Sequence, residues 1–260
     1  MSRASGRVFI VGAGPGDPGL LTVRGAELIG AADDLVVDAL VPAAVYRDSA
    51  ARIVYVGKRG GRPSVSQREI ESILVRLARA GRTVVRLKGG DPSVFGRVSE
   101  EARALDQAGV DYEVVPGVSS ALAAPLALGV AVTERDVADR VTVMTGHRRR
   151  SGEEVPSLPT YDARQTVVLL MALGNLEALV GSALAEGYPS TLPAVAISRA
   201  TMPDQRSVAE VLQRLPAAVA AAALETPATV VIGAVAQGLL SQETGEPLFP
   251  ASLLVAPGSL

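Results

Sequence analysis

Short apolar runs and helix-like stretches alternate along the first half of the chain. The apolar runs that predict buried strands cover residues 8–11, 35–37, 53–56, 84–87 and 112–115. Strands that are buried on both faces consist of near-continuous Val, Ile and Leu, and helical patterns separate these runs. The first half is therefore predicted to form a parallel sheet that helices cover on both faces.

The clearest predicted helix covers residues 67–80. Ser66 and Glu69 have the spacing of a capping box, in which two side chains satisfy free N–H groups of the first turn. Apolar residues follow at helical spacing on one face, namely Ile70, Ile73, Leu74, Leu77 and Ala78. Gly81 follows the last turn, where glycine commonly ends a helix. Another helix is predicted over residues 20–32.

The second half also has an α/β pattern. Strands are predicted over residues 141–144, 166–171, 194–197 and 228–232, and helices over residues 176–186, 209–215 and 217–224. Pro216 separates the last two helices, because proline breaks a helix interior. We expect an α/β fold with two α/β domains, residues 1–128 and residues 129–240, followed by a loose tail over residues 241–260.

Composition removes several classes of site and partner. The chain has no cysteine and a single histidine, His147, so a disulfide and a metal centre with Cys or several His ligands are excluded, and no metal is predicted. The net charge is −2, and the basic run at 148–150 is best interpreted as a solvated loop, so no nucleic-acid partner is expected. No apolar run reaches the roughly 18 residues of a membrane span. The polar start does not resemble a secretory signal, so we expect a cytoplasmic protein without membrane association.

A glycine-rich segment, Gly12–Pro18, follows the first predicted strand. Glycines at the end of a strand let a ligand approach the backbone closely. The segment departs from the dinucleotide pattern G-x-G-x-x-G, because Asp17 takes the place of the third glycine. Pro15 also removes an N–H group that could hold a phosphate, and Asp17 would repel one. The segment favours a ligand without phosphates, although Gly12 alone could serve only a tight turn.

Two further segments follow predicted strands. Gly89, Gly90 and Asp91 lie where open α/β sheets bind ligands. Asp91 can accept hydrogen bonds from ribose hydroxyl groups or an amino group, while a simple Gly-Asp turn explains the same residues equally well. Ser119 also follows a strand, and it could cap the next helix, offer its hydroxyl to a ligand, or do both.

An acid and an amine, Asp38 and Lys58, also follow predicted strands. Facing one site, they could accept and donate a proton, although the pattern by itself favours a surface ion pair. The chain is acidic overall, yet the segments after the strands carry several basic residues, which suits a substrate ringed with carboxylates. The residues that we predict to bind such a substrate are Arg59, Arg62, Lys88 and Arg97.

Seven segments together resemble the uroporphyrinogen-III C-methyltransferases of the tetrapyrrole methylase family. In family order, they are V-G-A-G-P-G-D-P-G-L-L-T at 11–22, D-A-L-V at 38–41, V-G-K-R-G-G at 56–61, R-L-K-G-G-D-P at 86–92, F-G-R at 95–97, V-V-P-G-V-S-S-A at 114–121 and T-G-H at 145–147. One such motif alone is weak, whereas all of them in order are highly specific. The resemblance extends from about residue 8 to residue 237.

The resemblance implies two α/β domains with the active site in the cleft between them, and a homodimer. It implies S-adenosylmethionine as the methyl donor, S-adenosylhomocysteine as its product, and uroporphyrinogen III as the tetrapyrrole substrate. Two methylations would give precorrin-2 via precorrin-1, toward cobalamin and sirohaem. By motif position, Asp38 is the implied proton acceptor and Lys58 the implied proton donor. The implied cofactor contacts are Pro15, Gly89, Gly90, Asp91, Val94, Ser119, Ser120, Met171, Ala200 and Ala228.

Two places depart from the family pattern. Residues 98–99 are Val-Ser where the family usually has a glycine pair. Glu134 replaces a histidine that is common in the family, and it adds a carboxylate near a site for a carboxylate-rich substrate. These departures bear on the substrate and leave the methyl donor as it is.

Three alternative hypotheses stay open at this point. A methyltransferase that acts on a later precorrin would share the scaffold. A nicotinamide oxidoreductase is disfavoured by Pro15 and Asp17 in the first glycine-rich segment. A non-catalytic binding protein would explain the fold but not the arrangement of Asp38 and Lys58.

Overall fold

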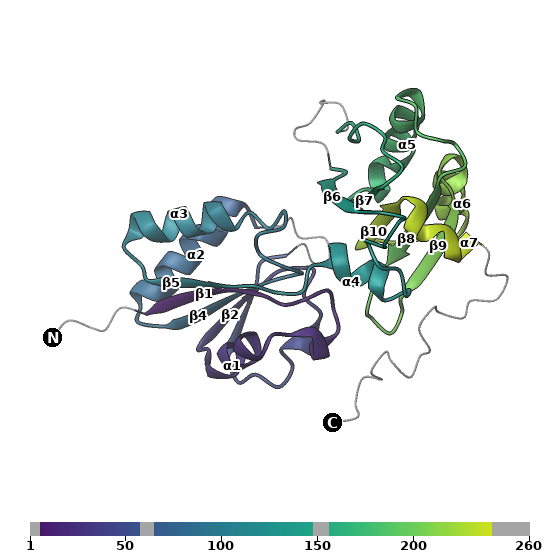
Figure 1. Ribbon diagram of the computed structural model, residues 1–260. Coiled ribbons are helices and arrows are strands. Elements are labelled where there is room, and N and C mark those ends of the chain that lie inside the picture. Colours follow the sequence, from purple (N-terminus) through teal and green to yellow (C-terminus); the bar gives the residue numbers. More distant parts are fainter. Residues whose placement is uncertain (1–5, 58–64, 148–155, 241–260) are drawn as a thin grey trace. The chain divides into compact units, whose positions relative to one another are not determined.

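The computed structural model describes residues 6–57, 65–147 and 156–240, which form two compact units (Figure 1). The units are Met1–Ser120 and Ala121–Leu260, so they divide before the position suggested by the sequence, which was after residue 128. The predicted tail, 241–260, lies outside the described residues. Within the described ranges, no helix is long and apolar enough to cross a membrane.

Parallel strands form the sheet of the first unit, in the order β3-β2-β4-β1-β5. The strands are β1 (Arg7–Gly12), β2 (Asp34–Val37), β3 (Arg52–Tyr55), β4 (Thr83–Lys88) and β5 (Tyr112–Val115). Each strand overlaps an apolar run that predicted it. The parallel sheet expected for the first half is therefore confirmed.

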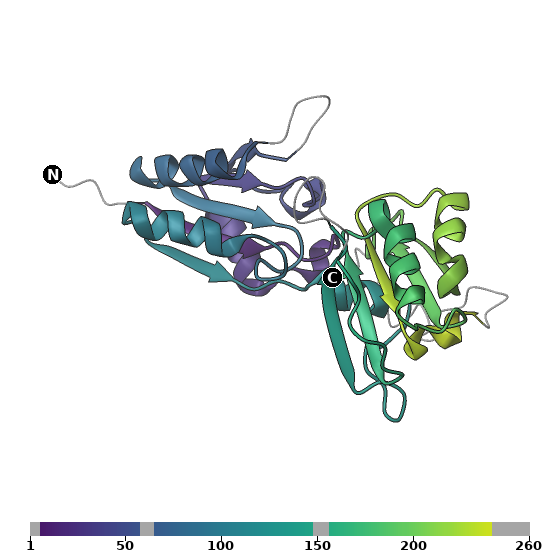
Figure 2. The same ribbon diagram turned by 90° about the horizontal axis from the view of Figure 1, so that it is seen from above.

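Helices cover both faces of this sheet. Leu28 and Ile29 of α1 (Val23–Ala31) join the core on one face, while α2 (Gln67–Arg79) and α3 (Val98–Ala108) pack on the other. The two helices α2 and α3 lie side by side in both views (Figure 1 and Figure 2). The predicted capping box opens α2, since Ser66 Oγ accepts from Glu69 N at 3.3 Å and Ser66 N donates to Glu69 Oε2 at 2.8 Å. The pattern did not predict α3, whose first turn is mostly polar.

A mixed sheet forms the second unit, in the order β6-β7-β10-β8-β9, and only β6 and β7 pair in parallel. The strands are β6 (Arg140–Thr145), β7 (Gln165–Leu170), β8 (Pro193–Ser198), β9 (Arg206–Val211) and β10 (Ala228–Ile232). One core contains residues of α5 (Leu176–Ala185) and α6 (Leu215–Ala221). A separate core contains Ala121 and Ala124 of α4 (Ser120–Leu126), and α7 (Gln237–Leu240) supplies Leu239 at its margin. Short 3-10 helices cover Pro18–Leu20, Ala43–Val45, Leu173–Asn175, Leu212–Arg214 and Ala234–Ala236.

The predicted helix over residues 209–215 is wrong. Residues up to Val211 belong to β9, where Ala209 pairs with Val195 and Val211 with Pro193 in an antiparallel ladder. The following helix, α6, begins at Leu215, so Pro216 lies in its first turn, where proline costs no hydrogen bond. The apolar residues of this stretch fit both a strand and a helix, and pairing with β8 decides between them.

A buried carboxylate links β2 to its neighbours at the amino edge of the first sheet. Asp34 has no exposed side-chain surface, and its oxygens accept from Arg52 Nε at 2.5 Å and from Arg82 Nε at 2.7 Å. Burial alone raises the pKa of Asp34, but the hydrogen bonds from Arg82 and Arg52 outweigh it, so its pKa lies below the usual value. The carboxylate form is therefore the one that the folded state stabilises.

We expect Asp34→Asn to lower the free energy of unfolding at pH 7 by about 1–3 kcal/mol, because an amide cannot accept from both arginines. A carboxyl group with a lowered pKa stabilises the fold above its unfolded pKa, near 4, and this stabilisation is lost as the pH falls through the lower, folded value. Urea titrations from pH 7 to pH 3 should therefore show a shallower acid loss in the variant. Asp48→Asn, at an exposed aspartate, is the control. Equal loss of stability in both variants would contradict the role of Asp34.

Candidate active site

The strands of the first sheet are parallel, so the segments that follow them meet at one edge, the carboxyl edge. Backbone hydrogen bonds join these segments directly. Gly14 N donates to Gly90 O at 3.2 Å and Gly90 N donates to Gly14 O at 2.7 Å, which pairs the segment after β1 with the segment after β4. Asp38 N donates to Leu87 O at 3.2 Å, which ties the end of β2 to β4.

Three backbone segments approach each other more closely than side chains would allow. A Cβ atom on Gly12 would lie 2.6 Å from Gly117 N and 2.7 Å from Gly90 O. A Cβ atom on Gly117 would collide with the same oxygen of Gly90. Gly90 itself has φ +69°, a left-handed conformation that glycine adopts without strain. The first two positions therefore exclude any side chain for reasons of space, and the third favours glycine for reasons of backbone conformation.

Asp91 holds two of these segments together. Its Oδ2 accepts from Gly117 N at 2.9 Å, and its Oδ1 accepts from Ser93 N at 2.8 Å and from the Ser93 hydroxyl. Burial raises the pKa of Asp91, but the hydrogen bonds from Ser93 and Gly117 more than offset this, and the net pKa is lowered. The Gly-Asp turn and the ligand site proposed for it are thus compatible, because a carboxylate with these partners keeps further lone pairs.

The predicted cofactor residues of the first unit all lie on the three joined segments. They are Pro15, Gly89, Gly90, Asp91, Val94, Ser119 and Ser120. A Cβ atom on Gly90 would be 3.7 Å from both the backbone nitrogen and the hydroxyl oxygen of Ser120, so the turn after β4 faces the start of α4. Residues 13–18, 89–94 and 116–120 contain two aspartates and neither lysine nor arginine. This chemistry suits a cationic or neutral ligand better than a phosphate.

The predicted cofactor residues of the second unit share an edge of its own sheet. Met171 follows β7 and Ala200 follows β8, while Ala228 begins β10, which runs antiparallel to both strands. Thr229 pairs with Leu170 and Ala228 with Ser198, so the register brings the three positions to one edge. Met171 has φ +55°, which is strained for a residue with a side chain, and it is half exposed.

Asp38, the predicted proton acceptor, lies directly after β2 at the carboxyl edge. Its Oδ1 accepts from Ala39 N at 2.9 Å and its Oδ2 from Arg86 Nη2 at 3.0 Å. The side chain remains 36% exposed, so the carboxylate is fixed in direction and still open to a ligand. Its predicted partner Lys58 lies outside the described residues, as do Arg59 and Arg62.

Two charged residues that had no function predicted from the sequence, Arg86 and Glu101, are linked to Asp38 in the interior. Arg86 of β4 and Glu101 of α3 are buried, and Arg86 Nε donates to Glu101 Oε1 at 3.1 Å. Arg86 interrupts an apolar strand run, and a buried charge requires a partner. Its position in the sequence could therefore have indicated a buried ion pair. Its partner could not be located, because α3 itself was not predicted.

The two described residues predicted to bind substrate already have acidic partners. Lys88 is buried and donates to Glu101 Oε1 at 2.9 Å, while burial and the nearby Arg86 lower the pKa of its ammonium group. Lys88 is therefore placed in the interior and not at the surface of the site. Arg97 is exposed and donates to both oxygens of Glu100 at 2.8 and 2.6 Å, and this pairing raises the pKa of Arg97.

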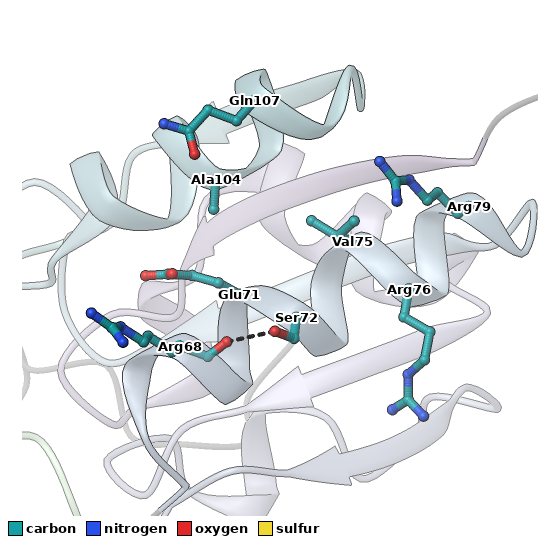
Figure 3. A pocket seen from close by; sticks show the side chains of 8 residues that line it. All are labelled: Arg68, Glu71, Ser72, Val75, Arg76, Arg79, Ala104 and Gln107. Atoms are coloured by element: carbon teal, nitrogen blue, oxygen red, sulfur yellow. Dashed lines mark hydrogen bonds between the residues drawn. The ribbon is translucent and has the colours of Figure 1, made fainter.

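A groove on the helical face of the first unit lies apart from these residues. It runs between α2 and α3, and Ser72 donates to the carbonyl oxygen of Arg68 at 2.8 Å on its wall (Figure 3). Its lining residues are Arg68, Glu71, Ser72, Val75, Arg76, Arg79, Ala104 and Gln107. None of the predicted site residues that the structure describes lines this groove, which lies between two surface helices.

Comparison with known proteins assigns the chain to one family of enzymes. A family model described as Tetrapyrrole (Corrin/Porphyrin) Methylases matches residues 7–216. The chain is 42% identical over 236 residues to the chloroplastic S-adenosyl-L-methionine-dependent uroporphyrinogen III methyltransferase of Arabidopsis thaliana, covering 89% of this chain and 64% of that protein. It is 43% identical over 235 residues to Siroheme synthase 1 of Halorhodospira halophila, covering 89% of this chain and 48% of that protein. The chain thus spans about half the length of the siroheme synthase.

Solved structures agree with this match. The native uroporphyrin III C-methyltransferase of Thermus thermophilus has a TM-score of 0.78 at 36% identity, covering 92% of this chain and 97% of that one. The same enzyme complexed with S-adenosyl homocysteine has a TM-score of 0.76 at 37% identity, covering 88% and 93%. A cobalt precorrin-4 methyltransferase has a TM-score of 0.76 at 26% identity, covering 88% and 95%. These matches confirm the predicted α/β fold and the predicted resemblance.

Gly117→Ala should destabilise the first unit, because its new methyl group would meet the backbone of Gly90 and Gly12. Overpacking of this kind costs about 1–3 kcal/mol in the free energy of unfolding. The control is Gly30→Ala on α1, where an added Cβ atom meets nothing within 4 Å and alanine suits a helix better than glycine. Chemical denaturation of both variants measures the difference. A Gly117→Ala protein as stable as the wild type would contradict the close approach of the three segments.

Proposed function

The chain belongs to the tetrapyrrole (corrin/porphyrin) methylase family, and from this premise we propose that it methylates carbon atoms of uroporphyrinogen III. Two methyl groups from S-adenosylmethionine would give precorrin-2 via precorrin-1. The observation that carries the proposal is a fixed, partly exposed carboxylate, Asp38, at the same sheet edge as a cradle of three joined backbone segments. The names of the plant and Thermus relatives support this choice of substrate.

The joined segments fit S-adenosylmethionine in both shape and charge. They have no side chain at Gly89 and Gly90, they carry aspartates that would repel a phosphate, and they contain no basic side chain to offset this repulsion. In our proposal, Asp91, Ser119 and Ser120 are cofactor contacts, and Met171, Ala200 and Ala228 are proposed as further contacts on the resemblance alone. The bound cofactor would supply an electrophilic methyl group, so the protein needs no metal for this step.

Asp38 would act as the proton acceptor. Methylation of a pyrrole carbon leaves a positively charged macrocycle, and a base must then remove one proton to neutralise it. The carboxylate of Asp38 is held by Ala39 N–H and by Arg86, and its remaining lone pairs are available for this proton. The remaining rate enhancement comes from positioning of the reacting groups, which can remove about 7–11 kcal/mol of the activation barrier.

The substrate contacts are proposed for basic residues around this edge. Arg97 is exposed, and an arginine paired on one side with Glu100 still has donors for a carboxylate. Arg59 and Arg62 are proposed for the same task, and Lys58 as the proton donor, on the resemblance alone. Lys88 is left out of the substrate contacts, because Glu101 already neutralises it in the interior. The homodimer and the cytoplasmic location expected from the sequence belong to the same proposal.

The product made from uroporphyrinogen III tests the proposed function directly. The purified chain is incubated with uroporphyrinogen III and S-adenosylmethionine without oxygen, and the oxidised product is analysed by mass spectrometry. Two added methyl groups are expected. No addition, together with intact calorimetric binding of S-adenosylhomocysteine, would overturn the substrate assignment. It would favour a later precorrin, on which the cobalt precorrin-4 methyltransferase with the same fold acts by its name.

Asp38→Asn should lower the turnover number by about 10²–10⁴-fold, because the amide keeps the shape of the side chain and cannot accept the proton. The affinity for S-adenosylhomocysteine, measured by calorimetry, should stay the same, since the variant leaves the cradle intact. Asp111→Asn is the matched control, an exposed aspartate that precedes β5 at the opposite edge of the same sheet. Near-normal turnover in Asp38→Asn would show that another group takes the proton.

A further inference from the structure

Four charged side chains form a continuous chain of hydrogen bonds under the carboxyl edge of the first sheet. Asp38 bonds to Arg86, Arg86 bonds to Glu101, and Glu101 bonds to Lys88, with distances of 3.0, 3.1 and 2.9 Å. The exposed fractions of the Arg86, Glu101 and Lys88 side chains are 2%, 0% and 5%, against 36% for Asp38. Asp38 is thus the one member of this chain that substantially faces solvent.

The guanidinium of Arg86 has no freedom to turn within this chain. Its Nε faces Glu101, its Nη2 faces Asp38, and its Nη1 donates to Leu87 O at 3.1 Å and more weakly to Val36 O at 3.4 Å. Because the planar guanidinium group makes hydrogen bonds on three sides, it presents only one N–H group to Asp38. The second oxygen of Asp38 is then left to the backbone of Ala39 and to the open side.

We propose that Glu101 is a positioning residue for the methyl transfer, which acts by neutralising Arg86 and Lys88 from inside the unit and so leaves Asp38 available to the substrate. This inference rests on the proposed function of Asp38 as the proton acceptor. Without the negative charge of Glu101, Arg86 would have Asp38 as its one ion-pair partner among the described residues, and Lys88 is attracted to Asp38 as well. Burying a charge without a partner is costly, so Asp38 would be drawn inward to both cations and away from the open side.

The environment of Lys88 makes this charge balance measurable. Among the described residues, the charged groups that interact with its ammonium are Arg86 on the same strand, Glu101 and Glu100 on α3, and Asp38 after β2. Burial and Arg86 lower the pKa of Lys88, whereas Glu101 and Asp38 raise it. Loss of the Glu101 charge should therefore lower the pKa of Lys88 further.

Glu101→Gln removes the charge and preserves the hydrogen bonds. Both bonds of Glu101 are accepted by Oε1, which a glutamine retains, and Oε2 has no hydrogen-bond partner among the described residues. The amide group of glutamine can take the place of Oε2. An effect of this variant therefore reports the charge and not the loss of a contact. Asp106→Asn, at an exposed aspartate of the same helix, is the matched control.

The first experiment measures Lys88 by NMR in the full chain, with no cofactor present. The sequence contains two lysines, so ¹³C-labelled lysine gives two Cε signals, and the signal that persists in Lys58→Arg belongs to Lys88. In Glu101→Gln, the titration midpoint of Lys88 should fall by about 1–3 pH units, while Asp106→Asn leaves it unchanged. An unchanged midpoint in Glu101→Gln would overturn the charge balance.

The second experiment separates turnover from binding. Glu101→Gln should lower the turnover number by about 10²-fold, because a displaced reacting group has an effect of that size, and should leave calorimetric S-adenosylhomocysteine affinity unchanged. Normal turnover in this variant would overturn the positioning role, whatever the midpoint of Lys88. A wild-type chain that makes no methylated product contradicts the proposed function instead, and the NMR titration then still decides the charge balance.

Discussion

A guanidinium group sealed inside a parallel sheet has to be neutralised where it lies, and Arg86 imposes this constraint on the first unit. Its side chain is almost fully buried on a strand between β1 and β2, so bulk solvent does not reach the charge. Glu101 must come from the helix above, and Asp38 from the end of the neighbouring strand. Removal of one partner from such a buried pair usually costs about 3–5 kcal/mol. The fixed direction of Asp38 follows from this charge, and Glu101, which α3 brings to Arg86, is also the partner of Lys88 in the interior.

The ligand site itself is built mainly from backbone. Three segments that follow parallel strands touch at Gly12, Gly90 and Gly117, and Asp91 bonds across two of them. Side chains at these positions would have kept the segments apart. The close approach depends on the absence of a Cβ atom at the glycines. Because these segments carry aspartates and no basic residues, the same backbone that could hold a phosphate in another α/β protein is suited here to a cation.

The positions of the strands along the chain could be predicted from the sequence, because period and composition are local properties. Buried parallel strands contain few polar residues, and a strand end followed by glycines marks a ligand edge. Residues 206–211 were harder to assign, because a short run of mixed polar and apolar residues suits both a helix and a strand. Pairing with β8 decides for the strand. The role of Lys88 was out of reach for a related reason. A lysine beside two glycines resembles a surface residue that binds a ligand. Only the fold shows that Glu101 contacts this lysine in the interior.

Hydrogen exchange with and without S-adenosylhomocysteine tests most directly whether the backbone cradle is the ligand site. Slower exchange on ligand addition is expected in residues 13–18, 89–97 and 116–120, and in the second unit around Met171 and Ala200. The groove between α2 and α3 should not change. Protection confined to that groove, or the absence of protection from all three segments at a saturating ligand concentration, would contradict the account.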